Sequence, residues 1–274
     1  NDQQLSFNTF GPIEENVTAL AFDNNTIWVG GEDTYRAPAR GISHYNLNTQ
    51  EWKYFEAQNI IGLENPQIRT ILTDSTTVWF GTHTGLMRYN KRANRWLTYR
   101  DTEYWGRVNA LAKDQHILWI GSERGLALLD TRADSLDRVS GSERAIIYAM
   151  VTGPNHIWAG TEAGLYTCAR GSRKWRAVSD EKNFTKRPIR ALAMYDSMLY
   201  VATETPSSLL SYHIGQNTWQ EYTLPEIGSS RRVSIAASNK HVWISTNQGA
   251  FLLNLTDRLW TRYHTTEGLI HGGV

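Results

Sequence analysis

One short phrase occurs three times in this chain at a nearly constant spacing. It reads TVWFGTHTGLMRYN from residue 77, ILWIGSERGLALLD from residue 117 and HIWAGTEAGLYTCA from residue 156. Its central aromatic residue, here called the anchor, recurs in weaker copies at spacings of 51, 40, 39, 42 and 43 residues: Trp28, Trp79, Trp119, Trp158, Tyr200 and Trp243. A period of about 40 residues predicts a repeat architecture, in which every copy forms the same structural unit.

Each repeat contains four short apolar runs. In the second repeat, IRTILTD from residue 68 precedes the anchor run, Gly85 and Leu86 open the third run, and Trp96 and Tyr99 mark the fourth. The runs are rich in β-branched and aromatic residues and are bounded by Asn, Asp and Gly, which is typical of strands joined by tight turns. Repeats of four antiparallel strands predict an all-β fold, and specifically a β-propeller built of four-stranded blades.

We expect a single propeller domain over residues 1–274, with six complete blades and parts of a seventh. The complete blades fall at approximately 17–55, 68–99, 108–139, 147–178, 189–222 and 233–263. Residues 5–10 read as a leading fourth strand, and residues 268–274 read as the start of a further blade. Two arrangements of the ring stay open, one that closes with six blades and one with seven. We favour the interpretation that this sequence is a fragment of a longer protein.

The repeat pattern also predicts how the blades pack. The anchors are expected to lie in the core between neighbouring blades, because each buries a large aromatic area. A small residue two positions after each anchor is expected where a larger side chain would collide with the next blade. Asp74 and Asp114, which follow the first run of their repeats, are expected to cap turns rather than to bind calcium.

Composition and motifs narrow the function. A net charge of +1 argues against a nucleic-acid partner, which would require a concentrated basic surface. The single cysteine, Cys168, permits no disulfide within the chain, and no apolar run approaches the roughly 20 residues of a membrane span. The signatures G-x-S-x-G, H-E-x-x-H and the Walker loop do not occur, so no enzyme activity, cofactor or metal is expected.

Variable links gather on one face of the predicted propeller. The links from second to third strands and between blades vary in length, and the longest insertion is EDTYRAPAR at 32–40. Variable loops on a rigid scaffold usually carry binding. Arginine pairs with carboxylate or sulfate and an aromatic ring stacks on a sugar, so an oligosaccharide or other small anionic ligand is expected at the channel mouth. The candidate residues are Arg36, Arg40, Arg69, Trp105, Arg107, Tyr148, Arg190 and Arg232.

The alternative interpretation of these arginines is structural. Glu residues recur in the links after the anchors, and Arg–Glu pairs would staple neighbouring blades instead of binding a ligand.

The repeats resemble a known family. The pattern VxALAxD…WxGTxxGLxxY…W…Y, clearest at residues 68–90 and 108–130, resembles the two-component regulator propeller repeat, over nearly the whole chain from about residue 5. The resemblance implies a non-catalytic ligand-binding sensor domain outside the membrane, periplasmic or extracellular, in a bacterial signalling protein. It also implies an output domain in the same longer polypeptide and a homodimer. The fifth and sixth copies depart from the pattern, because they lack its Gly-Thr pair.

Two other functions stay open, because one propeller fold hosts many activities. A protein-interaction scaffold would use the same loop face for a partner chain. A propeller lyase or hydrolase would use carboxylates that recur at one repeat position, such as Glu123 and Glu162.

Overall fold

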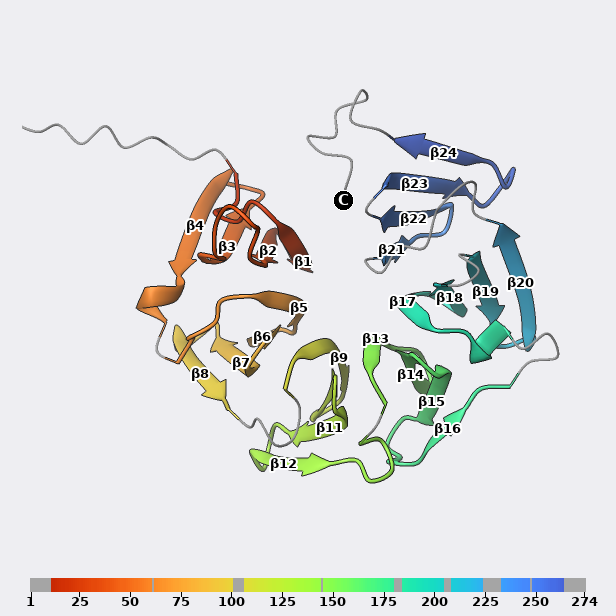
Figure 1. Cartoon of the computed structure of the whole chain (residues 1–274), viewed down its shortest axis with the longest axis horizontal. Helices are drawn as coiled ribbons and strands as arrows, with labels where there is room; N and C mark the ends of the chain where they lie inside the picture. The colour runs from red at the N-terminus through yellow and green to blue at the C-terminus, as the bar shows by residue number, and fades with distance from the viewer. Residues whose placement is uncertain are drawn as a thin grey trace, which may run out of the picture. The chain divides into compact units, whose positions relative to one another are not determined.

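The predicted fold class is confirmed. The structure is a computed structural model that describes residues 11–60, 62–100, 106–143, 145–179, 184–204, 208–223, 233–246 and 248–263. In these ranges 24 strands form six four-stranded antiparallel sheets, which are the blades of a β-propeller (Figure 1). The chain divides into two compact units, Asn1–Leu111 and Ala112–Val274. The strands expected at 5–10 and 268–274 lie outside the described residues.

The first unit contains blades one and two, each a meander of strands in chain order. Blade one comprises β1 (Val17–Asp23), β2 (Thr26–Gly31), β3 (Gly41–Asn46) and β4 (Glu51–Glu56). Blade two comprises β5 (Ile68–Thr73), β6 (Thr77–Thr82), β7 (Gly85–Asn90) and β8 (Arg95–Tyr99), and the short 3-10 turn η1 (Ala57–Asn59) precedes it. Blade three comprises β9 (Val108–Asp114), β10 (Ile117–Ser122), β11 (Gly125–Asp130) and β12 (Ser135–Arg138), and β9 crosses the boundary between the units.

The second unit contains blades four to six. Blade four comprises β13 (Ile147–Thr152), β14 (His156–Thr161), β15 (Gly164–Ala169) and β16 (Trp175–Ala177). Blade five comprises β17 (Ile189–Tyr195), β18 (Met198–Thr203), β19 (Ser208–His213) and β20 (Thr218–Thr223), and the 3-10 turn η2 (Phe184–Lys186) precedes it. Blade six comprises β21 (Val233–Ala237), β22 (His241–Thr246), β23 (Gly249–Asn254) and β24 (Trp260–Tyr263).

Left-handed turn residues explain why the strands are short and tightly connected. Asn24, Gln115 and Asp196 occupy the same place in the turn between first and second strands, with φ of 53°, 53° and 50°. Asparagine and aspartate tolerate this conformation better than most residues, which is why they punctuate the repeat. At the start of a third strand the requirement is stricter. Gly41 has φ 156°, and a Cβ there would lie 2.1 Å from the carbonyl oxygen of Phe55.

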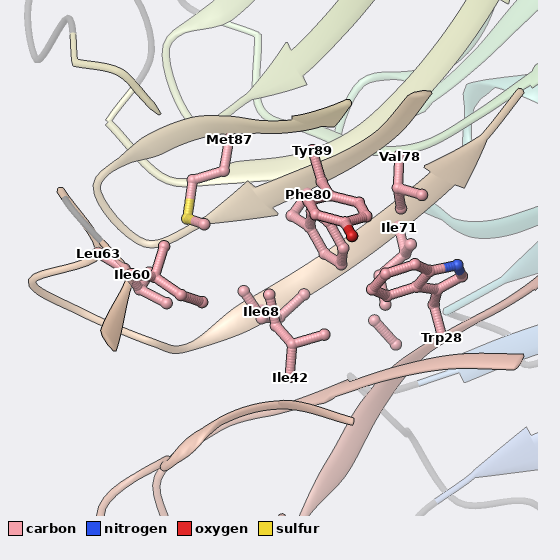
Figure 2. Close-up of a cluster of buried hydrophobic side chains, with 11 residues drawn as sticks. Trp28, Ile42, Ile60, Leu63, Ile68, Ile71, Val78, Phe80, Met87 and Tyr89 are labelled. Carbon is pink, nitrogen blue, oxygen red and sulfur yellow. The ribbon is translucent and has the colours of Figure 1, made fainter. Parts of the chain in front are cut away.

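The anchors pack between consecutive blades, as predicted, with one exception. Trp28 of blade one is 3% exposed and its indole lies 5.7 Å from the ring of Phe80 in blade two, within the core cluster of Figure 2. Trp158 of blade four is likewise buried in a cluster with residues of blade five. The prediction is wrong for Trp243, which is 42% exposed, because no described blade follows blade six.

The small residues after the anchors occupy crowded places, as predicted. A Cβ on Gly30 would lie 2.5 Å from Cβ of Ile68 in the next blade. The equivalent atom on Gly160 would lie 2.6 Å from Cγ2 of Ile189. These distances are shorter than any ordinary contact, so the first strand of the next blade can approach only where the preceding blade has almost no side chain.

The two aspartates that were expected to cap turns behave differently. Asp74 caps its turn, because its Oδ1 accepts hydrogen bonds from the backbone N–H groups of Thr76 and Thr77, both at 2.9 Å. Asp114 instead binds blade four. Its carboxylate accepts from Arg170 Nε at 2.7 Å and from the N–H of Gly171 at 2.8 Å. The expectation of a turn cap is therefore wrong for Asp114, since the arginine and the exposed N–H of the neighbouring blade lie within its reach.

Candidate ligand-binding site

A β-bulge positions the residues that the sequence singles out. In blades one, two, four and five, the pairing of the first and second strands slips across the second residue of the first strand: Thr18, Arg69, Tyr148 and Arg190. A bulge leaves the extra residue unpaired in the ladder and turns its side chain away from the regular pleat. Three of these residues are candidates from the sequence, which identified their shared repeat position but could not reveal the bulge.

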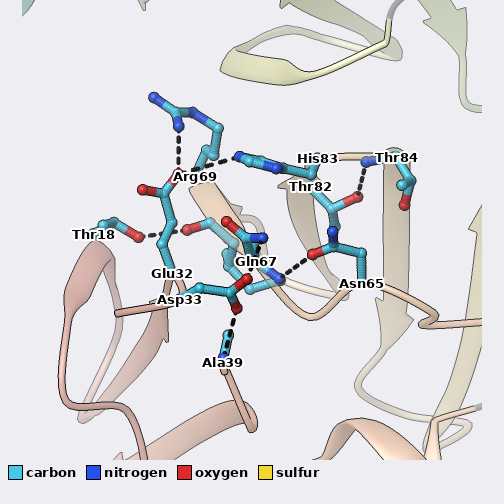
Figure 3. A network of polar contacts seen from close by, with 11 residues as sticks. Thr18, Glu32, Asp33, Ala39, Asn65, Gln67, Arg69, Thr82, His83 and Thr84 are labelled. Carbon is cyan, nitrogen blue, oxygen red and sulfur yellow. Dashed lines mark hydrogen bonds and ion pairs between the residues drawn. The ribbon is translucent and has the colours of Figure 1, made fainter. Parts of the chain in front are cut away.

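In the first unit, Arg69 meets a buried carboxylate from the preceding blade. Glu32 follows β2 and is 6% exposed. Its carboxylate accepts a hydrogen bond from Nη1 of Arg69 and forms an ion pair with this guanidinium (Figure 3). His83 Nε2 lies 3.4 Å from the same carboxylate oxygen, which is a long contact for a hydrogen bond. Thr18 adds a further link between the blades, because its hydroxyl donates to the carbonyl of Ile68 at 2.6 Å.

Burial and nearby positive charges lower the pKa of His83. Burial is the largest cause of its lowered pKa, and the positive charge of Arg107 is the next. Glu32 opposes both effects and Arg69 adds to them. Arg107 therefore lies within electrostatic range of the Arg69–Glu32–His83 group, so the structure brings two of the predicted arginines to one place. We call these four residues the loop-side cluster.

The insertion at 32–40 is held by two carboxylates. Asp33 accepts from the N–H of Ala39 at 2.7 Å through Oδ1 and from Gln67 Nε2 at 2.8 Å through Oδ2 (Figure 3). Glu14 is 5% exposed and accepts from the N–H groups of Arg40 and Gly41, both at 2.6 Å. Burial raises the pKa of Glu14, although these two hydrogen bonds oppose the shift. Sequence reasoning missed Glu14, because nothing in the repeat pattern marks it.

Two predicted residues of the insertion face solvent. Arg36 lies over the ring of Tyr35 at 4.9 Å, and Tyr35 is 89% exposed. Arg40 is also exposed, and it borders a small cavity of about 110 Å³ that Glu14 and Glu32 also line. This cavity is large enough for water or a small ion but not for a sugar ring.

In the second unit, a different group forms at the same repeat position. Arg190 donates from Nε at 2.7 Å and from Nη2 to Glu204 Oε2, a residue of its own blade. Its guanidinium lies 3.9 Å from the ring centre of Tyr148, which occupies the bulge of the preceding blade. The structure therefore brings Tyr148 and Arg190 together. Trp105 and Arg232 lie outside the described residues.

The described residues form neither a metal site nor a membrane-spanning helix. In the described ranges, no group of three or more His, Cys, Asp or Glu side chains is placed to hold a metal ion. The helical elements of the described part are three-residue turns, and none is long and apolar enough to cross a membrane.

The chain is similar in sequence to a histidine kinase and in fold to several proteins of known structure. No protein-family model matches the chain. The chain is 24% identical, over 97% of its length, to histidine kinase P4 of Formosa agariphila, and it spans 17% of that protein. The extracellular domain of the hybrid two component system BT3049 from B. thetaiotaomicron superposes with a TM-score of 0.68 and 15% identity, covering 94% of this chain and 36% of that one.

A designed protein has the same fold. The computationally designed Ika8 protein superposes with a TM-score of 0.63 and 15% identity, over 89% of this chain and 72% of its own. At these identities the structures establish the fold alone. Together with the sequence similarity to a histidine kinase, they confirm the predicted resemblance to the propellers of two-component regulators.

Proposed function

We propose that this chain is a ligand-binding sensor propeller, the input region of a bacterial two-component signalling protein. The observation that carries the proposal is the match of 97% of this chain to 17% of a histidine kinase. The rest of such a protein has room for an output module in the same polypeptide. The structural likeness to an extracellular domain supports a position outside the cytoplasm, in the periplasm or beyond the cell. The propeller itself is non-catalytic.

The ligand is a small anion, such as an acidic oligosaccharide. In the first unit Arg36, Arg40, Arg69 and Arg107 supply cations, and Arg69 keeps 29% of its side chain exposed despite its ion pair. In the second unit Tyr148 and Arg190 combine a ring face with a guanidinium. Trp105 and Arg232 stay in the proposed set on sequence grounds. Guanidinium groups bind carboxylate and sulfate through paired hydrogen bonds.

The loop-side cluster suggests how binding would be relayed. Arg69 joins blade two to Glu32 of blade one, so a ligand carboxylate at Arg69 competes with an internal carboxylate. Exchange of the two would loosen a contact between consecutive blades. A ligand that favours the loosened arrangement shifts the population toward it, and an output module can respond to that shift.

A binding experiment tests the ligand. Thermal unfolding is followed at fixed ionic strength with uronate-containing, sulfated and neutral oligosaccharides. An anionic ligand is expected to raise the midpoint with concentration, because it binds only the folded state. Arg69→Gln combined with Arg107→Gln should abolish the rise. The matched control is Arg95→Gln, an exposed arginine on the outer strand of blade two, which should leave it unchanged.

Two results would contradict the proposal. If no oligosaccharide of the panel changes the unfolding midpoint, the proposal of an anionic ligand is wrong. If the midpoint still rises in the double variant, the proposal that Arg69 and Arg107 bind the ligand is wrong. The signalling part is tested separately by the complete reading frame that encodes this chain. We expect it to encode a transmitter module, and a frame without one overturns the assignment to a two-component protein.

A further inference from the structure

The first unit has a larger cavity that the proposed function does not use. It lies between blades one and two, at the end where β1 turns into β2, and thus at the opposite end of the strands from the loop-side cluster. Its volume is about 400 Å³, within the range of about 300 to 1,000 Å³ that small-molecule sites occupy. We call it the turn-side cleft.

Aromatic rings form the floor of the cleft. Trp28 lies at its centre, with ring centres 4.4 Å from His44, 5.6 Å from Phe55 and 5.4 Å from Tyr89. Figure 2 shows Trp28 and Tyr89 projecting toward each other from the two blades. Burial, followed by the charge of Lys53, lowers the pKa of His44, so its imidazole is neutral at pH 7. The floor is therefore a largely apolar and uncharged surface.

Polar side chains form the rim. Asn24, Asn25 and Thr26 come from the turn of blade one, and Ser75 comes from the matching turn of blade two. They offer amide and hydroxyl groups, and three of them, Asn24, Asn25 and Ser75, are exposed. Such groups can donate and accept hydrogen bonds with the hydroxyls of a ligand.

One of the two cations at the rim lacks a carboxylate partner. Lys91 is paired, because its Nζ lies 2.5 Å from Asp23 Oδ2. Lys53 forms no ion pair with any described residue, and its ammonium lies 4.8 Å from the ring centre of Phe55. The cleft thus has one net positive charge beside an aromatic wall.

The same place between blades four and five shows that the repeat does not need these groups. Five lining residues are replaced there: Asp23 by Gly153, His44 by Thr167, Lys53 by Arg176, Phe55 by Val178 and Lys91 by Ile214. Met194 takes the position of Thr73, and its methyl group lies 3.0 Å from where a Cβ on Gly153 would stand. The indole nitrogen of Trp158 lies 3.3 Å from the same point, so Met194 covers this edge of the anchor. Blades four and five keep a tyrosine, Tyr212, at the position of Tyr89 and a cation, Arg176, at the position of Lys53, but they lack the aspartate, the histidine, the phenylalanine and the second lysine of this lining.

We propose that the turn-side cleft binds a ring of monosaccharide size that carries one carboxylate and several hydroxyls. The apolar face of the ring packs against the half-buried rings of His44 and Phe55, both of which contact the buried indole of Trp28. The hydroxyls bond to the amides and hydroxyls of the rim. The carboxylate pairs with Lys53, which forms no ion pair with any residue in the described part of the chain. This site is distinct from the loop-side cluster, so either can fail without the other.

The test is a titration of the intact chain with D-glucuronate, followed by NMR of the indole N–H groups. The Trp28 signal, assigned by its loss in Trp28→Phe, is expected to shift with saturation, whereas the Trp158 signal stays in place. Lys53→Gln should weaken the affinity about fivefold or more, as expected for a charge-assisted hydrogen bond. Arg176→Gln at the equivalent position of blade four is the matched control and should have no effect.

Two further ligands and one substitution complete the design. D-glucose lacks the carboxylate and benzoate lacks the hydroxyls, so each should bind more weakly than glucuronate. Thr73→Met imitates blade five and should block the cleft without loss of the fold. The proposal is overturned if glucose or benzoate binds as well as glucuronate, or if Lys53→Gln and Thr73→Met leave the Trp28 titration unchanged.

Discussion

Blades one and two share their apolar packing with blades four and five, but the polar contacts of the two pairs differ. In both, an anchor tryptophan packs on the following blade, and an arginine occupies the bulge of that blade. Arg69 reaches back to Glu32 in the preceding blade, and His83 shares that carboxylate. Arg190 binds Glu204 of its own blade and uses the preceding blade only through the ring of Tyr148.

The difference separates packing from polar chemistry. The apolar contacts follow the repeat and recur with the anchors. The polar contacts depend on side chains that change from blade to blade, so the same bulge can hold an ion pair between blades or within one blade. Binding at Arg69 would therefore disturb a salt bridge between two blades. Binding at Arg190 would act on a salt bridge that lies within blade five.

The largest effect is expected from the shared packing. Trp28→Ala and Trp158→Ala should each lower the free energy of unfolding by about 4 kcal/mol, because each removes a buried indole and leaves a cavity. Trp243→Ala should cost far less, because that side chain is 42% exposed. Chemical denaturation measures all three. A loss at Trp243 as large as that at Trp28 would contradict the distinction.

The second largest effect on stability is expected from the two arginine–glutamate ion pairs. Arg190→Ala should cost about 2 kcal/mol, since Glu204 is 16% exposed and loses both of its guanidinium contacts. Arg69→Ala should cost less, about 1 kcal/mol, because His83 stands beside Glu32 and can take up a proton. The free energy of unfolding at pH 7 decides the order, and a greater loss in Arg69→Ala would reverse our account.

Acid should affect the first unit through His83. Its pKa is lowered in the folded chain, so the unfolded chain binds the proton first as the pH falls. The stability that the neutral imidazole contributes is complete above pH 6.5, the ordinary histidine pKa, and is lost as the pH falls below it toward the lowered value. His83→Gln should flatten this part of the stability profile. Arg69→Ala should raise the pKa of His83, which an NMR titration can follow.

The smallest effect is expected at the aromatic contact of Arg190. Tyr148→Leu removes the ring beneath the guanidinium and should cost about 0.5 to 1 kcal/mol, whereas Tyr148→Phe keeps the ring and should cost less. The same pair of variants compared in an Arg190→Met background, which has no cation, gives the coupling energy between the ring and the guanidinium. A coupling of zero would mean that the ring merely fills space.

The regular part of this molecule was open to prediction from the sequence. Strands, turns, buried anchors and the crowding at Gly30 and Gly160 follow from side-chain size and periodicity, which repeat along the chain. The polar part was not predictable to the same degree. Whether Asp114 caps a turn or binds Arg170 depends on what the next blade presents, and that is a contact between residues 56 apart.

The site shows the same limit. The shared position of Arg69 and Arg190 was visible, but the backbone slip that turns them outward is a matter of strand register. Glu14 stands outside the repeat pattern, and the turn-side cleft combines an anchor, Trp28, with side chains that change from blade to blade, so the roles of both appear only when two blades are side by side.

The bulge in the first strand has a consequence for how such a protein can acquire new specificity. The extra residue takes no part in the strand ladder, so its side chain can change while every backbone hydrogen bond of the blade is kept. Blades one, two, four and five already place a hydroxyl, a guanidinium, a phenol and a guanidinium on this one device. A propeller built in this way can be adapted to a different ligand one substitution at a time, at positions where the sheet itself tolerates almost any side chain.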